Sequence, residues 1–206
     1  MAAQREAIMA VVLAAGASSR FGSPKGLAPF RGKTLIEHVL TELRAESSLS
    51  EVAVVVGANA EALEHVVSEQ GARVHRFSEW ERGMTASLRE GVALAQGLGA
   101  SAVLVCTLDQ PAANRVHFAR MIARRRAGAS LVASRYEGAL GIPVLFDRLH
   151  FAEISALPDA ARGKDVVLAH AASERFAAVA LEGGGLDVDT PEDLGRVTRA
   201  FPEEAR

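Results

Sequence analysis

The stretch IMAVVLAAGASSRFGSPK, residues Ile8–Lys25, joins a short apolar run to a loop of small, hydroxyl-bearing and basic residues. Its apolar part, Ile8–Ala14, has the length and composition of a buried strand. The loop carries two glycines, which let backbone N–H groups approach an anion closely, and the cations Arg20 and Lys25. It matches neither the Walker pattern nor the G-x-G-x-x-G dinucleotide fingerprint. These residues alone leave open an anion-binding turn or a surface turn with scattered cations.

Beyond this loop, short apolar runs alternate with amphipathic stretches in which apolar residues recur at helical spacing. Further strands are predicted at Glu51–Val56, Arg73–Arg76, Ala102–Leu108, Leu131–Ser134, Ile142–Phe146 and Phe176–Leu181. Helices are predicted at Thr34–Ala45, Glu61–Gln70, Thr85–Gln96, Arg115–Ala127, Asp147–Ala156, Lys164–Ala172 and Pro191–Ala200. Such alternation predicts a three-layer α/β/α fold with a mostly parallel sheet covered on both faces. No linker divides the chain, so we expect a single domain over residues 1–206.

The composition is that of an ordinary globular protein, with 49% hydrophobic and 23% charged residues and a formal net charge of -2. This balance argues against a nucleic-acid partner, which requires an excess of Lys and Arg on one face. The basic run of Arg120, Arg124, Arg125 and Arg126 is expected to be a solvated helix end. The single cysteine, Cys106, excludes an internal disulfide and fits a reducing compartment. No apolar stretch reaches about 20 residues, so we expect no membrane partner and a cytoplasmic protein.

Carboxylates follow two of the apolar segments, where open α/β sheets bind their ligands. Asp109 comes directly after the strand Ala102–Leu108, and it could hold Mg²⁺ or cap the next helix. Asp187 and Asp189 alternate in an extended segment, so their side chains face opposite sides. One of them can reach the ligand crevice, while Thr190 or Asp189 caps the last helix.

Five segments, in order, resemble the MobA-like nucleotidyltransferases, which transfer CMP or GMP to molybdenum cofactor. The Leu13–Lys25 loop resembles the family signature L-x-A-G-x-S-x-R-x-G-x-x-K at every fixed position. The other four segments are WERGMTASL (Trp80–Leu88), TLDQP (Thr107–Pro111), GIPVLF (Gly141–Phe146) and DVDTPEDL (Asp187–Leu194). Together they extend the resemblance over nearly the whole chain.

The resemblance implies a Rossmann-like fold of the nucleotide-diphospho-sugar transferase type and a Mg²⁺-dependent transfer of a nucleoside monophosphate with release of pyrophosphate. The L-A-A-G and D-Q-P sequences look more like the cytidylyl branch, which implies CTP as donor and molybdopterin as acceptor. Such an enzyme could also contact a molybdoenzyme transiently. A guanylyltransferase, or a transferase acting on another phosphorylated metabolite, is the first alternative.

The resemblance also assigns roles to individual residues. The nucleotide-binding residues would be Leu13, Ala14, Ala15, Gly16, Arg20, Lys25 and Ser87. Lys25, Arg20 and Asp109 would be catalytic, because fixed cations near the α-phosphorus stabilise the developing charge. Asp109 and Asp189, preferred slightly over Asp187, would hold Mg²⁺. Candidate acceptor-binding residues are Arg82, Arg162 and Lys164.

The chain departs from the family pattern at three places. Phe77 and Ser78 stand where many relatives have Asn-Pro, and Gly26 replaces the usual leucine after the loop lysine. The segment Pro158–Lys164 replaces a G-D-x-G-A sequence that is frequent in relatives. In that segment, Arg162 and Lys164 would take over the contact with the acceptor phosphate. The departures at Phe77 and Gly26 motivate a rival hypothesis, in which the protein binds a nucleotide or cofactor without catalysis and delivers it to a partner.

Overall fold

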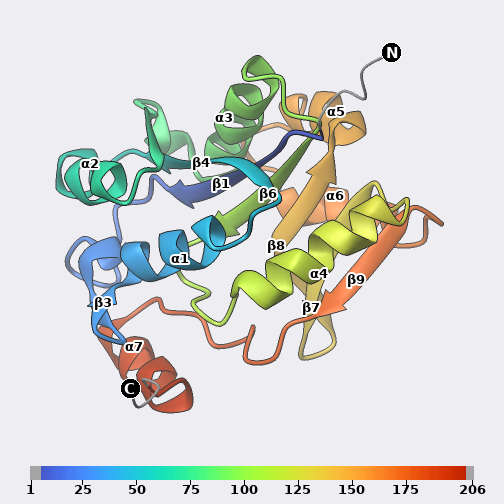
Figure 1. Cartoon of the computed structure of the whole chain (residues 1–206). Coiled ribbons are helices and arrows are strands. Elements are labelled where there is room, and N and C mark those ends of the chain that lie inside the picture. The colour runs from blue at the N-terminus through green and yellow to red at the C-terminus, as the bar shows by residue number, and fades with distance from the viewer. Residues whose placement is uncertain (1–5, 203–206) are drawn as a thin grey trace.

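The computed structural model describes residues 6–202 and contains a seven-stranded sheet in the order β5-β4-β1-β6-β8-β7-β9 (Figure 1). Neighbouring strands pair in parallel, except that β8 runs antiparallel to both β6 and β7. The strands are β1 (Ile8–Ala14), β4 (Leu49–Val56), β5 (Arg73–Arg76), β6 (Ala102–Thr107), β7 (Leu131–Tyr136), β8 (Ala139–Asp147) and β9 (Phe176–Ala180). The prediction of a mostly parallel sheet is confirmed.

Helices cover both faces of this sheet, which confirms the three-layer α/β/α prediction (Figure 1). One face is covered by α1 (Leu35–Arg44), α2 (Ala60–Glu69) and α4 (Arg115–Arg126). The other face is covered by α3 (Met84–Gly97), α5 (Phe151–Ser155) and α6 (Gly163–His170). Along β1, even-numbered residues from Ile8 to Ala14 join the first apolar layer and odd-numbered residues from Met9 to Leu13 join the second.

A third, smaller apolar cluster attaches the C-terminal helix α7 (Pro191–Ala200) to the body of the protein. It joins Val197 of α7 and the fully buried Val188 to Phe30 of a small hairpin, β2 (Pro29–Phe30) and β3 (Lys33–Thr34). Thr190 caps α7 in a reciprocal capping box with Asp193. Of the two residues expected to cap this helix, Thr190 is therefore the one that does, and Asp189 keeps its carboxylate for other contacts.

Two tight hairpins were not anticipated from the sequence. The β2–β3 hairpin turns through Arg31 and Gly32, and the β7–β8 hairpin turns through Glu137 and Gly138. All four residues have positive φ, as a type I′ turn requires. The second hairpin reverses β8 and also lengthens it, so that this strand begins at Ala139 and not at Ile142.

The segment after β6 confirms the predicted start of the next helix and excludes one of the two roles considered for Asp109. As predicted, α4 begins at Arg115. The side chain of Asn114 caps this helix by accepting from two backbone N–H groups. Asp109 therefore caps no helix, and its carboxylate accepts a hydrogen bond from the Thr107 hydroxyl.

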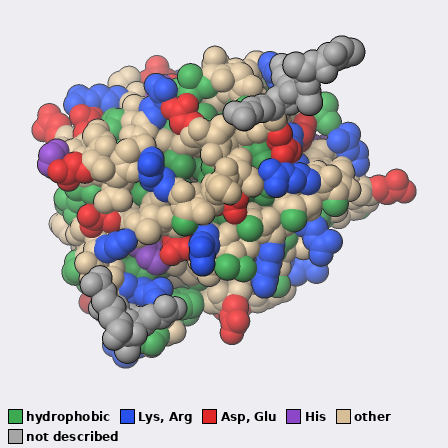
Figure 2. All heavy atoms as spheres, viewed as in Figure 1, with side chains coloured by type: hydrophobic (Ala, Val, Ile, Leu, Met, Phe, Trp, Pro, Cys, Tyr) green, Lys and Arg blue, Asp and Glu red, His purple; other side chains and the backbone are tan. Residues whose placement is uncertain are grey.

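The basic run at the end of α4 is paired with acidic groups. Arg125 lies 2.8 Å from the Asp147 carboxylate and also pairs with Glu6, which contacts Arg126 at 2.9 Å. On the face drawn in Figure 2, Lys and Arg side chains are interspersed with Asp and Glu side chains. Within residues 6–202, no helix has both the length and the apolar character needed to cross a membrane.

Gly91 of α3 packs directly against β1, because a Cβ atom there would lie 2.6 Å from Val11 Cγ1. Gly91→Ala is expected to lower the free energy of unfolding by about 1–2 kcal/mol, since overpacking outweighs the helix propensity gained. Gly97→Ala in the same helix meets nothing within 4 Å and should be neutral or stabilising. Chemical denaturation of both variants checks this, and equal effects would contradict the close packing of α3 on β1.

His117 of α4 is buried and bonds Ser134 of β7, with Nε2 and Oγ 2.8 Å apart. Burial lowers its pKa from 6.5 to about 4. As the pH falls from 6.5 to about 4, the unfolded chain therefore takes up a proton that the folded chain does not, and stability is lost. We expect His117→Gln to flatten this acid limb of the unfolding free energy by up to about 3 kcal/mol. Identical pH profiles for the variant and the original chain would rule out a neutral buried His117.

Candidate active site

The ends of β1 and β6 bring the glycine loop and Asp109 together. These strands are direct neighbours, with Leu13 opposite Thr107, so the two loops that follow them leave the sheet side by side. The β4–α2 connection supports the first loop from the other side, where the Ala58 N–H donates to the Ala15 carbonyl at 3.0 Å. The edge of the sheet thus places both sequence-predicted segments at one site, as the topology requires.

Val188 brings the C-terminal acidic segment to the same place. Its backbone N–H donates to the Asp109 carbonyl at 2.8 Å, and its own carbonyl accepts from Lys25 Nζ at 2.8 Å. The neighbouring Asp187 and Asp189 therefore lie on either side of a backbone that is fixed to both other segments. Three parts of the chain that are far apart in sequence meet at this residue.

Lys25 lies between two carboxylates. Its Nζ is 3.5 Å from Asp109 Oδ2 and 3.8 Å from Asp189 Oδ1, and its side chain is only 15% exposed. Arg20 approaches Asp189 from the solvent side and forms a two-pronged contact at 2.8 and 3.1 Å. Because the Arg20 side chain is 71% exposed, this outer pair is strongly screened, whereas Lys25 sits within the cluster.

A second cluster of polar residues lies around Gln110, a residue for which the sequence analysis predicted no contact. Its Nε2 lies 2.8 Å from the Tyr136 hydroxyl and 3.2 Å from both Asp187 Oδ1 and the Gly184 carbonyl. Burial raises the pKa of Tyr136 above its ordinary value of 10. The phenol is therefore protonated at neutral pH and can donate a hydrogen bond to a ligand. The D-Q-P sequence gave a signal for Gln110, but nothing local marked Tyr136.

Two cavities meet at Asp109. The smaller, of about 210 Å³, is bordered by the glycine loop and will be called the loop cavity; it is lined by Leu13, Ala14, Gly16, Ser18, Ser19, Arg20, Lys25, Met84, Thr107, Leu108, Asp109 and Asp189. The larger, of about 450 Å³, will be called the strand cavity, because β8 lines much of it. Both cavities are bordered by Leu13, Met84, Thr107 and Asp109, so a ligand in one would lie next to a ligand in the other.

The strand cavity is lined by both apolar and polar residues. Its apolar lining includes Val105, Val144 and Phe146 from β6 and β8. Its polar lining consists of Thr85, Thr107, Asp109, Gln110, Tyr136, Asp159, Arg162, Lys164 and Asp187. Arg162 and Lys164, predicted as acceptor-binding residues, thus line the same cavity as Asp109.

Three predicted ligand residues do not line either cavity. The Ser87 hydroxyl is buried and turns back to the Gly83 carbonyl at 3.3 Å, as serines within helices often do. Ala15 is buried, and its carbonyl is used by Ala58. Arg82 pairs with Glu79 and Asp159, and the hydrogen bonds that Asp159 accepts from Arg82 and Arg89 lower its pKa. Arg82 therefore supports the rim of the strand cavity through Asp159.

Two residues at which the chain departs from the family pattern, Gly26 and Phe77, have packing explanations. Gly26 is buried between two leucines, and a Cβ there would lie 2.8 Å from Leu63 Cδ2 and 3.1 Å from Leu108 Cδ1. Phe77 is buried in the apolar layer under α3, and its N–H bonds the Val56 carbonyl at 2.8 Å. Neither residue removes a charged or polar group from the two cavities.

The residues around Lys25 fit a hard divalent cation. Asp109 and Asp189 supply carboxylate oxygens, which are the ligands that Mg²⁺ prefers. Both are partly exposed and face the loop cavity, where a cation could keep its waters. Two cations, Arg20 and Lys25, face three carboxylates here, so further positive charge is electrostatically favourable.

The family model for the MobA-like NTP transferase domain matches residues 10–175. This span is well over half of the chain and contains both the Leu13–Lys25 loop and Asp109. The chain therefore belongs to the MobA-like NTP transferase family, and it is an enzyme of the nucleotidyltransferase class. The predicted membership and enzyme class are confirmed.

Relatives with different names share this family. The chain is 33% identical to the nicotine blue oxidoreductase of Paenarthrobacter nicotinovorans over 144 residues, 69% of this chain and 68% of that protein. It is 27% identical to the purine catabolism protein PucB of Bacillus subtilis over 202 residues, 94% of this chain and 97% of PucB. A 45-residue stretch is 56% identical to a probable molybdenum cofactor guanylyltransferase of Bacillus cereus, covering 22% of each protein.

Solved structures show the same architecture. The crystal structure of Rv0371c from Mycobacterium tuberculosis H37Rv matches with a TM-score of 0.81 and 30% identity, over 96% of this chain and all of that chain. A manganese complex of Rv0371c matches with a TM-score of 0.74 and 27% identity, over 95% of this chain and 100% of that chain. These matches agree with the fold class predicted from the sequence.

Because the ion pair between Arg20 and Asp189 is exposed, we expect replacement of Arg20 to weaken ligand binding with little effect on stability. Arg20→Ala should change the free energy of unfolding by less than about 1 kcal/mol, because exposed ion pairs contribute little. Nucleoside triphosphate affinity should fall about 10–100-fold, since charge-assisted hydrogen bonds to phosphate are lost.

Calorimetric titration and chemical denaturation check both halves of this prediction. Arg73→Ala is the matched control, because Arg73 also forms an exposed pair, with Glu51, but lines neither cavity. If Arg20→Ala bound nucleotide as tightly as the Arg73 variant, Arg20 would have no role in the loop cavity.

Proposed function

We propose that this nucleotidyltransferase transfers CMP from CTP to the phosphate of a molybdopterin-type cofactor, with release of pyrophosphate and dependence on Mg²⁺. The observation that carries the proposal is the position of Asp109. Its carboxylate borders both cavities and lies 3.5 Å from the amine of Lys25. A two-substrate transfer needs such a junction, because donor and acceptor must meet at one charged centre.

The loop cavity suits the triphosphate of the donor. Lys25 and Arg20 both line it, and each is already paired with a carboxylate that a nucleotide could replace as the anionic partner. Leu13, Ala14 and Gly16 supply close backbone approach for the base and ribose. We assign the nucleotide contacts to these five residues and not to Ser87 or Ala15, whose polar atoms are engaged elsewhere.

The strand cavity suits a flat, polar acceptor that carries a phosphate. Apolar walls from β6 and β8 can cover a ring system, and Gln110 and Tyr136 supply polar groups to the same lining. The Tyr136 hydroxyl, which accepts from Gln110 Nε2 at 2.8 Å, can donate to an acceptor atom of the ring system. Arg162 and Lys164, which also line this cavity, would hold other anionic groups of the acceptor.

In the proposed reaction, an oxygen of the acceptor phosphate attacks the α-phosphorus of CTP. A new phosphoanhydride bond forms, the bond between the α- and β-phosphates breaks, and pyrophosphate leaves. Lys25 stabilises the charge that develops on the phosphate oxygens, and Arg20 binds the departing end from the solvent side. A phosphate monoester is mostly ionised near neutral pH, so the chain needs no strong base.

Asp109 and Asp189 would hold Mg²⁺, which supplies charge neutralisation and orientation of the phosphates when bound. The manganese complex of Rv0371c is consistent with a divalent cation in this family. Asp189 is preferred over Asp187 because it borders the loop cavity, whereas Asp187 borders the strand cavity and is bonded to Gln110.

The choice of CTP rests on the resemblance of L-A-A-G and D-Q-P to the cytidylyl branch, while the local similarity to a probable guanylyltransferase favours GTP. The oxidoreductase and purine-catabolism names of other relatives point to further acceptors within the family. Pyrophosphate release should be measured with each of the four NTPs, with and without molybdopterin. Pyrophosphate release from CTP that requires molybdopterin supports the proposal. Release with another nucleotide or another acceptor would assign the enzyme a different activity within the family.

Asp109→Asn tests the carboxylate itself. We expect kcat to fall by at least about 100-fold, as for other groups that stabilise the transition state electrostatically. The fold should be retained, because asparagine can still accept from Thr107 and Asp109 caps no helix. Pyrophosphate release and thermal unfolding check the two outcomes.

Asp147→Asn is the matched control, because Asp147 pairs with Arg125 at the opposite end of β8 and lines neither cavity. Its kcat should remain unchanged. Nucleotide binding without turnover in the original chain, under all four NTPs and with the acceptor present, would instead support the non-catalytic delivery hypothesis.

A further inference from the structure

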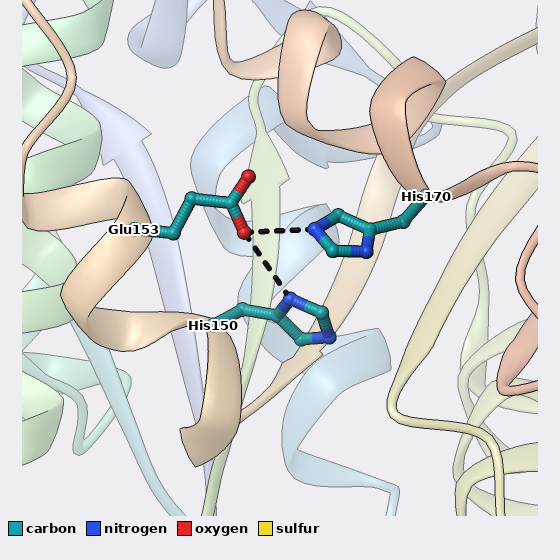
Figure 3. Close-up of side chains that lie close together, drawn as sticks. All are labelled: His150, Glu153 and His170. Carbon is teal, nitrogen blue, oxygen red and sulfur yellow. Dashed lines mark hydrogen bonds and ion pairs between the residues drawn. The ribbon is translucent and has the colours of Figure 1, made fainter.

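Two histidines and a glutamate converge beside α5 and α6 (Figure 3), and none of the three lines either cavity. His150 ends the short 3-10 helix Arg148–His150, Glu153 lies in α5, and His170 is the last residue of α6. Within residues 6–202, this is the one place where three such ligand atoms lie within 4.8 Å of one another. We refer to these residues as the His–Glu–His cluster.

A single carboxylate oxygen connects both rings. Glu153 Oε2 lies 2.8 Å from His170 Nε2 and 3.6 Å from His150 Nδ1 (Figure 3). The two imidazole rings are edge to face, with centroids 4.6 Å apart. Both ring nitrogens therefore converge on the same carboxylate oxygen, and the three ligand atoms lie within 4.8 Å of one another.

The buried member of the cluster is held in place by a second contact. His150 Nε2 lies 3.1 Å from the hydroxyl of the buried Ser130. When this nitrogen donates to Ser130, Nδ1 carries a lone pair that faces the Glu153 carboxylate, and a shared cation would stabilise the two acceptors.

We propose that the His–Glu–His cluster binds a divalent transition-metal ion of the zinc type. Two imidazoles and one carboxylate are a recognised ligand set for Zn²⁺, with a solvent molecule in the fourth position. Zinc-to-ligand distances of about 2.0–2.1 Å place tetrahedral ligands about 3.3 Å apart, which lies between the 2.8 and 3.6 Å separations of Glu153 Oε2 from the two ring nitrogens. Glu153 and His170 are partly exposed, which leaves a path for the ion and for water.

The site is separate from the proposed Mg²⁺ site at Asp109 and does not depend on the proposed function. Its ligands are softer, because imidazole nitrogens favour transition metals whereas Mg²⁺ prefers oxygen. His170 lies roughly 9 Å along α6 from Lys164, which lines the strand cavity at the other end of the same helix. A bound ion would link the C-terminal end of α6 to α5 and so brace the helix that carries this part of the cavity rim.

Zinc titration of the metal-stripped, full-length protein tests the proposal. The titration is followed by calorimetry without nucleotide and with excess Mg²⁺, which competes with zinc for sites that offer only carboxylate oxygens. We expect a single zinc ion per chain to bind, because the three ligand atoms of the cluster lie within 4.8 Å of one another. His170→Ala and Glu153→Gln should each weaken this binding by about 100-fold or more, since even outer partners of zinc ligands contribute about 10–100-fold.

His65→Ala is the matched control. His65 also faces a glutamate, Glu69, at 3.2 Å, but this pair lies on the surface of α2 without a third ligand. The His65→Ala variant should bind zinc as tightly as the original chain does. The exposed ligands are mutated because replacing the buried His150 could disturb folding. Zinc affinity that is unchanged in both His170→Ala and Glu153→Gln, or no measurable zinc binding by the original chain, would overturn the proposal and leave the cluster as a hydrogen-bonded brace.

Discussion

The backbone of Val188 is the point on which the geometry of the site depends. Its N–H is bonded to the Asp109 carbonyl, its C=O is bonded to Lys25 Nζ, and its side chain is fully buried in the small apolar cluster that anchors α7. A buried backbone group without a partner is costly, so both hydrogen bonds hold the segment firmly in place. Because side chains alternate along an extended chain, the same backbone sends Asp187 toward the strand cavity and Asp189 toward the loop cavity.

The sheet explains why two cavities share one edge. β1 and β6 are parallel neighbours, so the glycine loop and Asp109 emerge together at their carboxyl ends. β8 runs in the opposite direction, so its first residues, Leu140 to Ile142, reach this edge and wall the strand cavity. The reversed strand thus adds an apolar wall beside the charged centre. Under the proposed function, this arrangement holds a charged donor and a largely flat acceptor at adjoining positions.

Much of this was predictable from the sequence, because it follows from local periodicity. Apolar runs identified the strands of the main sheet, and helical spacing identified α1 to α7. The hairpins at Arg31–Gly32 and Glu137–Gly138 were missed, since their first residues are not the Asn or Asp that usually mark type I′ turns. Tertiary contacts decided the rest: Ser87 turned inward to the backbone, Arg82 paired with acids, and Tyr136 came to the site from a distant strand. No spacing rule connects Asp109 to Val188, or His170 to Glu153.

The central claim is that Asp109 lies at the boundary between a donor site and an acceptor site. The most direct measurement is a crystal structure of the protein with Mg²⁺ and a non-hydrolysable CTP analogue. We expect the triphosphate to lie in the loop cavity in contact with Lys25 and Arg20. Its α-phosphate should lie beside Asp109 and face an open strand cavity. A nucleotide bound within the strand cavity, or phosphates remote from both Lys25 and Asp109, would contradict it.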